Sequence, residues 1–179
     1  MDREKIEELL KRLEETESQL NRELEKGAET IKCDFLQERT PLWEYIRSAK
    51  PGYLLTAPVI YAMIIPAIVM DLFVTVYQAV CFPVYKIKKV KRGDYIVFDR
   101  HRLKYLNALQ KLNCVYCAYF NGLIAYVREI ASKTEQFWCP IRHARRVRNA
   151  HRRYWRFMRY GDGKDLKERW LKLRKELEK

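Results

Sequence analysis

Apolar residues recur at a seven-residue spacing in the N-terminal part of the chain, in two rows that together make a heptad seam. One row holds Leu10, Leu24 and Ile31, and its companion holds Ile6, Leu13 and Leu20. Glu17 falls within the first row and weakens the seam. The pattern predicts a long helix over residues 1–38 that either packs on its own protein or self-associates as a coiled coil.

The middle of the chain is apolar and almost free of charge. From Pro51 to Tyr85 there are 35 residues, and Asp71 is the only charged one. A helix needs about 20 apolar residues to cross a bilayer. The rest of the chain has too little apolar sequence to surround such a helix. After a linker over residues 39–50, residues 51–85 are therefore predicted to be a membrane segment, and a buried core helix of a soluble protein is the alternative.

Prolines and flanking charges leave two membrane topologies open. Pro58, Pro66 and Pro83 interrupt the segment, and proline favours a kink. The segment is therefore either a single tilted span or a re-entrant hairpin bent near Pro66. Both flanks are basic, but five basic residues follow the segment closely and three precede it, which favours a cytoplasmic C-terminal part.

Asp71 is a candidate intramembrane polar site, because an ionisable group at membrane depth is costly and marks a functional position by default. No second acid or base accompanies it between Pro51 and Tyr85. The alternative is a neutral aspartate in a helix contact, or an aspartate that lies near the interface.

A small helical domain is expected over residues 86–160. The run GDYIVF is typical of a short strand, and Asp99 then suits the N-cap of a helix over residues 100–112. A second helix is predicted roughly over residues 114–134, where apolar side chains gather on one face.

Two further helices complete the predicted fold. One begins near Cys139, with Pro140 in its first turn, and continues through Tyr160. The last lies within residues 161–179 and carries an apolar row on one face. That row consists of Leu166, Trp170, Leu173 and Leu177. The fold class expected is mainly α, with a coiled-coil-like helix, a membrane helix, a metal-clipped helical domain and an amphipathic C-terminal helix.

Charge divides the chain into two parts. Residues 1–38 carry seven basic and twelve acidic side chains, whereas residues 39–179 carry 29 basic and 11 acidic ones, and the whole chain has a net charge of +13. The 48% of hydrophobic residues excludes a disordered tail. No phosphate-loop, dinucleotide or hydrolase motif is present, so the sequence favours a protein that is not an enzyme.

Three cysteines and one histidine form a candidate metal site. Cys114 and Cys117 are three residues apart, and Cys139 and His143 are four apart, so each pair shares a helical face. Tetrahedral zinc takes four nitrogen or sulfur ligands in two such pairs. We expect a structural zinc ion at these four residues. The alternative for His143 is a core histidine that donates to a carbonyl.

The same residues leave a redox function open. Iron bound by these four ligands, or a reactive pair of Cys114 and Cys117, would make the chain a membrane-bound electron-transfer or redox protein. A membrane enzyme would need further groups near an open metal position. The candidates are Asp99, His101, Glu129 and Glu135. For the two glutamates, ion pairs with nearby arginines are the simpler expectation.

Residues 142–160, here called the Arg-rich segment, contain no lysine and no acid but have aromatic residues between the arginines. Arginine binds phosphate through two parallel hydrogen bonds, and aromatic side chains settle among lipid headgroups. The segment is expected to bind anionic lipids, with an acidic protein surface and nucleic acid as alternatives. Its arginines are Arg142, Arg145, Arg146, Arg148, Arg152, Arg153, Arg156 and Arg159.

Three stretches of the chain, DRHRLKYLN, NCVYCAYFNG and TEQFWCPIRHA, resemble an uncharacterised family of bacterial membrane-associated proteins. The resemblance implies a bacterial source and a membrane setting, and it implies no activity. The sequence thus predicts a membrane-anchored assembly protein of the bacterial inner membrane, with its soluble domain in the cytoplasm. Its expected partners are anionic lipids, further copies of the chain and a membrane protein.

Overall fold

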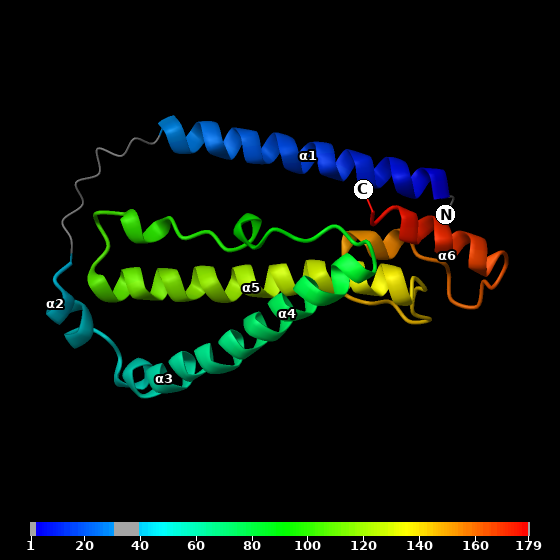
Figure 1. Cartoon of the computed structure of the whole chain (residues 1–179). Coiled ribbons are helices and arrows are strands. Elements are labelled where there is room, and N and C mark those ends of the chain that lie inside the picture. The colour runs from blue at the N-terminus through cyan, green and yellow to red at the C-terminus, as the bar shows by residue number, and fades with distance from the viewer. Residues whose placement is uncertain (1–2, 31–39, 179) are drawn as a thin grey trace. The chain divides into compact units, whose positions relative to one another are not determined.

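The computed structural model describes residues 3–30 and 40–178, and this part of the chain is mainly helical, as expected (Figure 1). The described residues do not include Ile31 of the predicted seam, Cys33 or the end of the predicted 1–38 helix. The helices are α1 (Arg3–Thr30), α2 (Leu42–Arg47), α3 (Pro51–Ala62), α4 (Ile64–Val84), α5 (Ala108–Trp138) and α6 (Leu166–Lys175). Three short 3-10 turns are η1 (Arg92–Asp94), η2 (Arg100–Arg102) and η3 (Arg152–Arg156).

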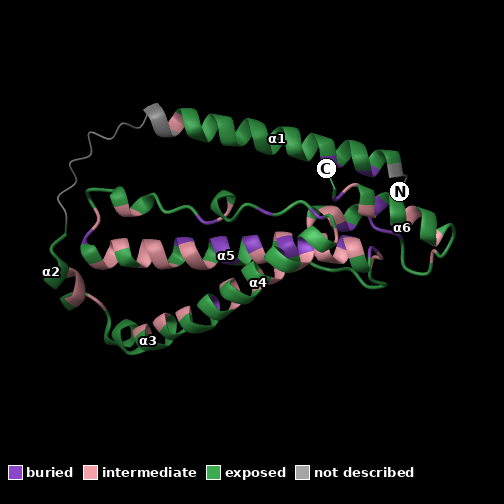
Figure 2. Ribbon diagram, viewed as in Figure 1, coloured by how far each residue is buried: buried purple, intermediate pink, exposed green. Residues whose placement is uncertain are grey.

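The chain divides into two compact units, and α5 contributes to both. A central unit consists of residues 37–133 and 176–179, and a terminal unit consists of residues 1–36 and 134–175. Each unit has its own buried side chains (Figure 2).

In the central unit, α3 and α4 follow one another with only Met63 between them. The Met63 backbone stays in the right-handed helical region, with φ −62° and ψ −14°. The chain therefore does not reverse near Pro66, and the re-entrant hairpin that the sequence left open is not formed. Residues 51–84 make one apolar helix with a local interruption.

A return segment, residues 85–107, leads from the end of α4 back along it to the start of α5. Three side-chain hydrogen bonds join α3–α4 to α5, and they follow the same order along both helices. They connect Tyr61 to Asn113, Asp71 to Tyr119 and Gln78 to Tyr126. Because all three pairs run in the same order, α3–α4 and α5 are parallel. The GDYIVF run lies in this return segment and forms no strand there.

α5 joins the two helices expected over residues 100–112 and 114–134 into one, which begins at Ala108 and ends at Trp138. The expected helix over residues 100–112 is wrong in its first part, because Asp99 makes no side-chain cap and residues 100–107 form only the η2 turn, whereas residues 108–112 belong to α5. Asn107 caps α5 instead, as its Oδ1 accepts from the Gln110 N–H at 2.9 Å. The Gln110 side chain accepts in return from the Asn107 N–H, also at 2.9 Å, which completes a capping box.

Gly122 marks the closest approach of the return segment to α5. A Cβ atom on this residue would lie 2.5 Å from the Tyr95 carbonyl oxygen and 2.9 Å from the Ile96 Cα. Only a glycine lets the two backbones come this close. Around it, Leu123, Tyr126 and Ile96 are buried and form the core of the central unit.

In the terminal unit, the predicted helix from Cys139 to Tyr160 is wrong. Ile141 and Met158 form an isolated parallel bridge, in which the Arg142 N–H donates to the Met158 carbonyl at 2.8 Å. Asn149 adopts a left-handed backbone conformation with φ 51°. The bridge and the left-handed residue are incompatible with a continuous helix, so the Arg-rich segment is a loop that contains the η3 turn.

α6 packs on the C-terminal end of α5. The Trp170 Nε1–H and the Arg174 Nε–H both donate to the Phe137 carbonyl at 2.8 Å, which satisfies a helix end that has no intrahelical donor. Leu173 and Leu177 are each only 3% exposed. Leu166 and Trp170 are half-buried, so the predicted apolar row is covered in part by its own chain.

Candidate functional site

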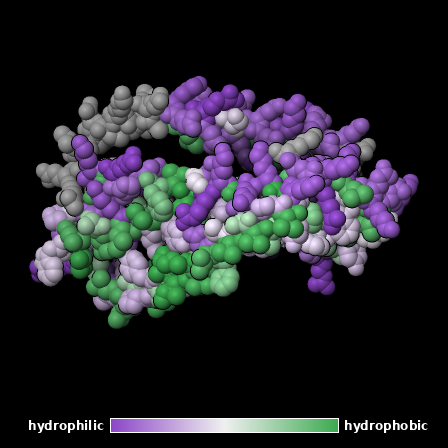
Figure 3. All heavy atoms as spheres, in the orientation of Figure 1, coloured by the Kyte–Doolittle hydropathy of each residue, from purple (hydrophilic) through white to green (hydrophobic). Residues whose placement is uncertain are grey.

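The most extensive apolar surface among the described residues lies on α3–α4. The helix Pro51–Val84 is long and apolar enough to cross a membrane, and only 6% of its most apolar window is buried. Figure 3 shows hydrophobic atoms gathered over this part of the chain. A core helix of a soluble protein would be mostly buried, so that alternative does not describe α3–α4.

The outer face of α4 is entirely apolar. Its exposed side chains recur along one side of the helix from end to end, whereas its inner face packs on the return segment and α5. The exposed members are Ile65, Ile68, Val69, Leu72, Phe73, Val76, Val80 and Val84. We call this set the apolar stripe of α4.

Asp71 lies on the inner face of α4 and is fully paired. Arg92 Nη2 lies 2.7 Å from its Oδ2, and Arg92 Nε donates to its Oδ1 at 3.3 Å. The Tyr119 hydroxyl donates to Asp71 Oδ2 at 3.0 Å, and Thr75 adds a longer contact of 3.4 Å. The base that the apolar segment lacks is thus supplied by the return segment. This pairing favours a role for Asp71 in fixing the fold.

The hydrogen bonds of this cluster also change the proton affinity of the two partners. The bond to Asp71 raises the pKa of the Arg92 guanidinium above its usual value. Burial raises the pKa of Tyr119, and the hydrogen bond to Asp71 adds to this effect. Both groups therefore keep their protons in the folded protein at neutral pH.

A second polar layer lies one heptad further along both helices, at Gln78 and Tyr126. Gln78 Nε2 donates to the Tyr126 hydroxyl at 2.9 Å and to the Val90 carbonyl at 3.2 Å. Gln78 Oε1 accepts from the Val90 N–H at 2.6 Å. Sequence reasoning missed this layer. The signal was present, since Gln78 is the only amide side chain between Pro51 and Tyr85 and lies seven residues after Asp71.

The structure does not bring the four predicted metal ligands together. Cys114 and Cys117 lie in the first part of α5, and Cys139 follows its last residue. Since a helix rises 1.5 Å per residue, the 22 positions from Cys117 to Cys139 extend about 33 Å. No group of three or more His, Cys, Asp or Glu among the described residues is placed to hold a metal ion. The zinc site, and the iron alternative with the same ligands, therefore have no geometric support.

The cysteines and Glu135 do not converge on one point, as the ligands of a metal ion would. Cys114 is half-buried, and Cys117 and Cys139 are exposed, all three as free thiols. An arginine was the expected partner of Glu135. In the structure the Glu135 Oε2 instead lies 2.7 Å from His151 Nε2. The other ring nitrogen of His151 accepts from the Tyr154 N–H at 3.1 Å, so the structure uses both nitrogens of this ring.

His143, the fourth predicted ligand, lies in the loop that replaces the expected helix. Its backbone N–H donates to the Tyr154 hydroxyl at 2.8 Å, and its ring stacks on the Tyr154 ring at 5.9 Å between centroids. This stacking and the adjacent hydrogen bond give His143 a structural role in the loop.

The Arg-rich segment presents most of its guanidinium groups to solvent. Arg145, Arg146, Arg148, Arg152, Arg156 and Arg159 are exposed, whereas Arg142 and Arg153 are half-buried. Arg152 forms an ion pair with Glu17 of α1, which lies in the same unit. Arg153 donates to the Gln136 side chain at 3.3 Å. The segment thus combines a few internal contacts with a strongly basic exposed surface.

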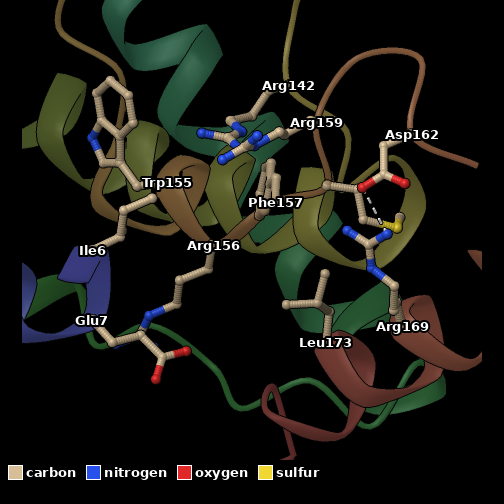
Figure 4. A pocket seen from close by; sticks show the side chains of 11 residues that line it. Ile6, Glu7, Arg142, Trp155, Arg156, Phe157, Arg159, Asp162, Arg169 and Leu173 are labelled. Carbon is tan, nitrogen blue, oxygen red and sulfur yellow. Dashed lines mark hydrogen bonds and ion pairs between the residues drawn. The ribbon is translucent and has the colours of Figure 1, made fainter. Parts of the chain in front are cut away.

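A small cavity of about 100 Å³ lies beside this segment in the terminal unit (Figure 4). Arg142, Arg156 and Arg159 line it together with the apolar side chains of Trp155 and Phe157. At its edge Arg169 Nη1 contacts Asp162 Oδ2 at 2.9 Å, and this hydrogen bond lowers the pKa of Asp162. The concentration of guanidinium groups makes this surface suitable for phosphate oxygens.

Only part of the predicted heptad seam is covered. Ile6 and Leu10 of α1 are 9% and 8% exposed, whereas Leu13, Leu20 and Leu24 are between 56% and 60% exposed. The later part of the seam therefore remains an open apolar row within α1.

Comparisons of this chain with protein-family models, with curated proteins and with solved structures find no match. The resemblance to a bacterial membrane-associated family stays a prediction from the sequence.

Proposed function

We propose that this chain is a membrane-bound structural or assembly protein. In this proposal α3–α4 is embedded in lipid through its apolar stripe, and the Arg-rich segment binds the phosphate groups of anionic lipids. The setting expected from the sequence is the bacterial inner membrane, with the C-terminal part on the cytoplasmic side. A second copy of the chain is the proposed partner for α1.

The exposed stripe of α4 is the observation that carries the proposal. Soluble monomers seldom expose a continuous apolar patch of this extent, because water contact with each such side chain is unfavourable. Lipid removes that cost without requiring a specific protein partner.

The Arg-rich segment supports the choice of an anionic surface. Its exposed arginines lie beside Tyr160, which is 70% exposed, and Trp155. Tyrosine and tryptophan settle at the interface between lipid and water, and guanidinium groups bind phosphate through paired hydrogen bonds. Because the chain is bound to the membrane, the segment would meet lipid phosphate at a high effective concentration.

Flotation of the purified full chain with vesicles tests the membrane part of the proposal. After detergent removal, the protein should float with vesicles of neutral phosphatidylcholine. A variant with Leu72→Asp and Val76→Asp on the apolar stripe should lose this association. Leu20→Asp with Leu24→Asp on α1 gives a control with the same chemical change elsewhere. A chain that stays soluble and monodisperse without lipid or detergent would contradict the proposal.

Vesicles that contain phosphatidylglycerol test the Arg-rich segment separately. We expect Arg145→Gln, Arg146→Gln and Arg148→Gln together to remove the preference for anionic over neutral vesicles. Lys167→Gln, Lys172→Gln and Lys175→Gln remove the same charge from exposed positions of α6 and should keep most of that preference. Since the interaction is electrostatic, the preference should also fall as salt rises. An unchanged preference in the arginine variant would exclude this segment as the lipid-binding surface.

A further inference from the structure

We propose that α3–α4 lies in the plane of the membrane, within one leaflet, and does not cross the bilayer. The proposal rests on the membrane-bound function proposed above and specifies how the chain is attached. Lipid would cover the stripe of α4, while the central unit stays at the headgroup level on the same side.

The two faces of α4 have different surroundings. Ala67, Gln78 and Phe82 point inward and are buried by the protein, and Asp71 on the same face is paired with Arg92. The opposite face carries the exposed apolar side chains of the stripe. Figure 2 shows exposed residues along α4. A helix with one apolar exposed face and one protein-covered face matches the geometry of an interfacial helix.

The return segment places charges beside the middle of α4. The Gln78–Val90 and Asp71–Arg92 contacts fix this segment in register with the helix. From Val84 at the end of α4 to Asp71 there are 13 residues, so Arg92 is held about 20 Å along the helix from that end. The half-thickness of the hydrocarbon core is only about 15 Å.

A transverse α4 would therefore carry charged groups into the hydrocarbon core, and Arg92 past its centre. Lys89, Lys91 and Asp94 are exposed on the return segment, and Arg92 itself is partly exposed. Charged side chains at that depth are rare and face a bundle interior or a water-filled cavity. In an in-plane arrangement the same side chains stay at the level of the headgroups and water.

Both ends of α3–α4 have the features of an interface. Trp43 and Tyr53 are exposed near its beginning, where Arg47 and Lys50 are exposed as well. Lys86 is exposed at the other end. Basic residues at both ends, with aromatic residues beside the first, are expected when both ends lie at one membrane surface. The in-plane arrangement also explains why the charges on the two flanks orient a spanning helix only weakly.

Depth measurement along the stripe gives the decisive experiment. Ile65, Leu72 and Val80 are exposed to similar extents, 65%, 61% and 62%, and each is replaced by Cys and spin-labelled in a chain with its native cysteines changed to Ser. The full chain is reconstituted in vesicles of phosphatidylcholine and phosphatidylglycerol. The in-plane helix should give three equal depths. A spanning helix would give depths that change by up to about 22 Å between the first and last label.

Accessibility of the two flanks provides an independent test. Glu44→Cys before the helix and Lys89→Cys after it are exposed positions, and both should react with an impermeant maleimide from the same side of sealed vesicles. Reaction of the two cysteines from opposite sides of the vesicle, or spin-label depths that change steadily along the stripe, would overturn the in-plane arrangement. Either result would leave the membrane-bound function intact. Spin labels without lipid contact would overturn both the in-plane arrangement and the membrane-bound function. This outcome includes the case in which a second copy of the chain covers the stripe. Helix content by circular dichroism must match the wild type in every variant.

Discussion

The side-chain amide of Gln78 pairs with both backbone polar groups of Val90, accepting from its N–H at 2.6 Å and donating to its carbonyl at 3.2 Å. Val90 belongs to an extended segment that is not paired with a strand. Without Gln78, the Val90 N–H and carbonyl would therefore lack these hydrogen-bond partners. Tyr126 of α5 joins the same amide at 2.9 Å. One residue of α4 thus connects the three segments of the central unit.

Gln78→Leu should destabilise the protein by about 2–4 kcal/mol, because it leaves buried polar groups of Val90 and Tyr126 without partners. The measurement is thermal or denaturant unfolding in a mild detergent, followed by circular dichroism. Gln19→Leu makes the same chemical change on the exposed side of α1 and should alter stability by less than about 0.5 kcal/mol. Equal stability of both variants would show that the Gln78 contacts do not hold the return segment.

The sequence predicted the apolar helix well but not its protein contacts. A run of 35 residues with a single charge predicts a helix long and apolar enough to cross a membrane, and the structure has such a helix over Pro51–Val84. The partner of Asp71 was not predicted, because Arg92 lies 21 residues away in a segment without helical periodicity. Long-range contacts of an irregular segment leave no repeating pattern in the sequence.

In the Arg-rich segment, the sequence predicted a helix that the structure does not form. Its His, Val and Tyr residues recur at helical spacing, and Pro140 suits a first turn, so local pattern alone favoured a helix. The Ile141–Met158 bridge and the positive φ of Asn149 instead fold the segment back on itself. Tertiary contacts decided this conformation. The zinc prediction placed two ligand pairs at one site although a helix was expected between them, and the structure extends that helix to Trp138, directly before Cys139.

Gly122→Ala should destabilise the central unit by about 1–3 kcal/mol, since the new methyl group would overlap the Tyr95 carbonyl oxygen and one of two backbones must move. Gly52→Ala is the matched control on α3, where nothing lies within 4 Å of the added Cβ. There the substitution should be neutral or stabilise by up to about 1 kcal/mol, because alanine favours a helix. The prediction fails if both substitutions shift the unfolding midpoint in the same direction.

Tyr119→Phe should reduce the loss of stability at alkaline pH. The folded protein raises the pKa of Tyr119, so it holds the phenolic proton more tightly than the unfolded chain does. The resulting stability is fully present below the unfolded pKa of about 10 and is lost as pH rises through the higher folded pKa. Unfolding midpoints of wild type and variant at pH 8 and above pH 10 measure the effect. Tyr105→Phe, at an exposed position of the return segment, is the control and should follow the wild type.

Metal chelation should leave helix content and the unfolding midpoint unchanged. A zinc ion shared by Cys117 and Cys139 would require α5 to break, because about 33 Å of helix separates them. For the same reason, Cys139→Ser and Cys117→Ser should not change the metal content of the purified chain. Elemental analysis before and after chelation gives the answer, with a zinc-dependent protein treated in parallel to show that the chelator acts. One zinc per chain, lost in both variants together with helix content, would instead restore the four-ligand site.

Self-association through α1 is the last prediction. Ile6 and Leu10 are covered within the terminal unit, but Leu13, Leu20 and Leu24 leave an exposed apolar row on an otherwise charged helix. A second α1 helix can cover this row, because the heptad spacing is retained along it. Leu13→Ser with Leu20→Ser should therefore lower the mass per particle measured by light scattering in detergent, after subtraction of the detergent. Leu9→Ser removes an exposed leucine that lies outside the seam and should keep the wild-type mass. A wild type that is already monomeric, or a seam variant that keeps its oligomeric mass, would show that α1 does not form the interface between copies.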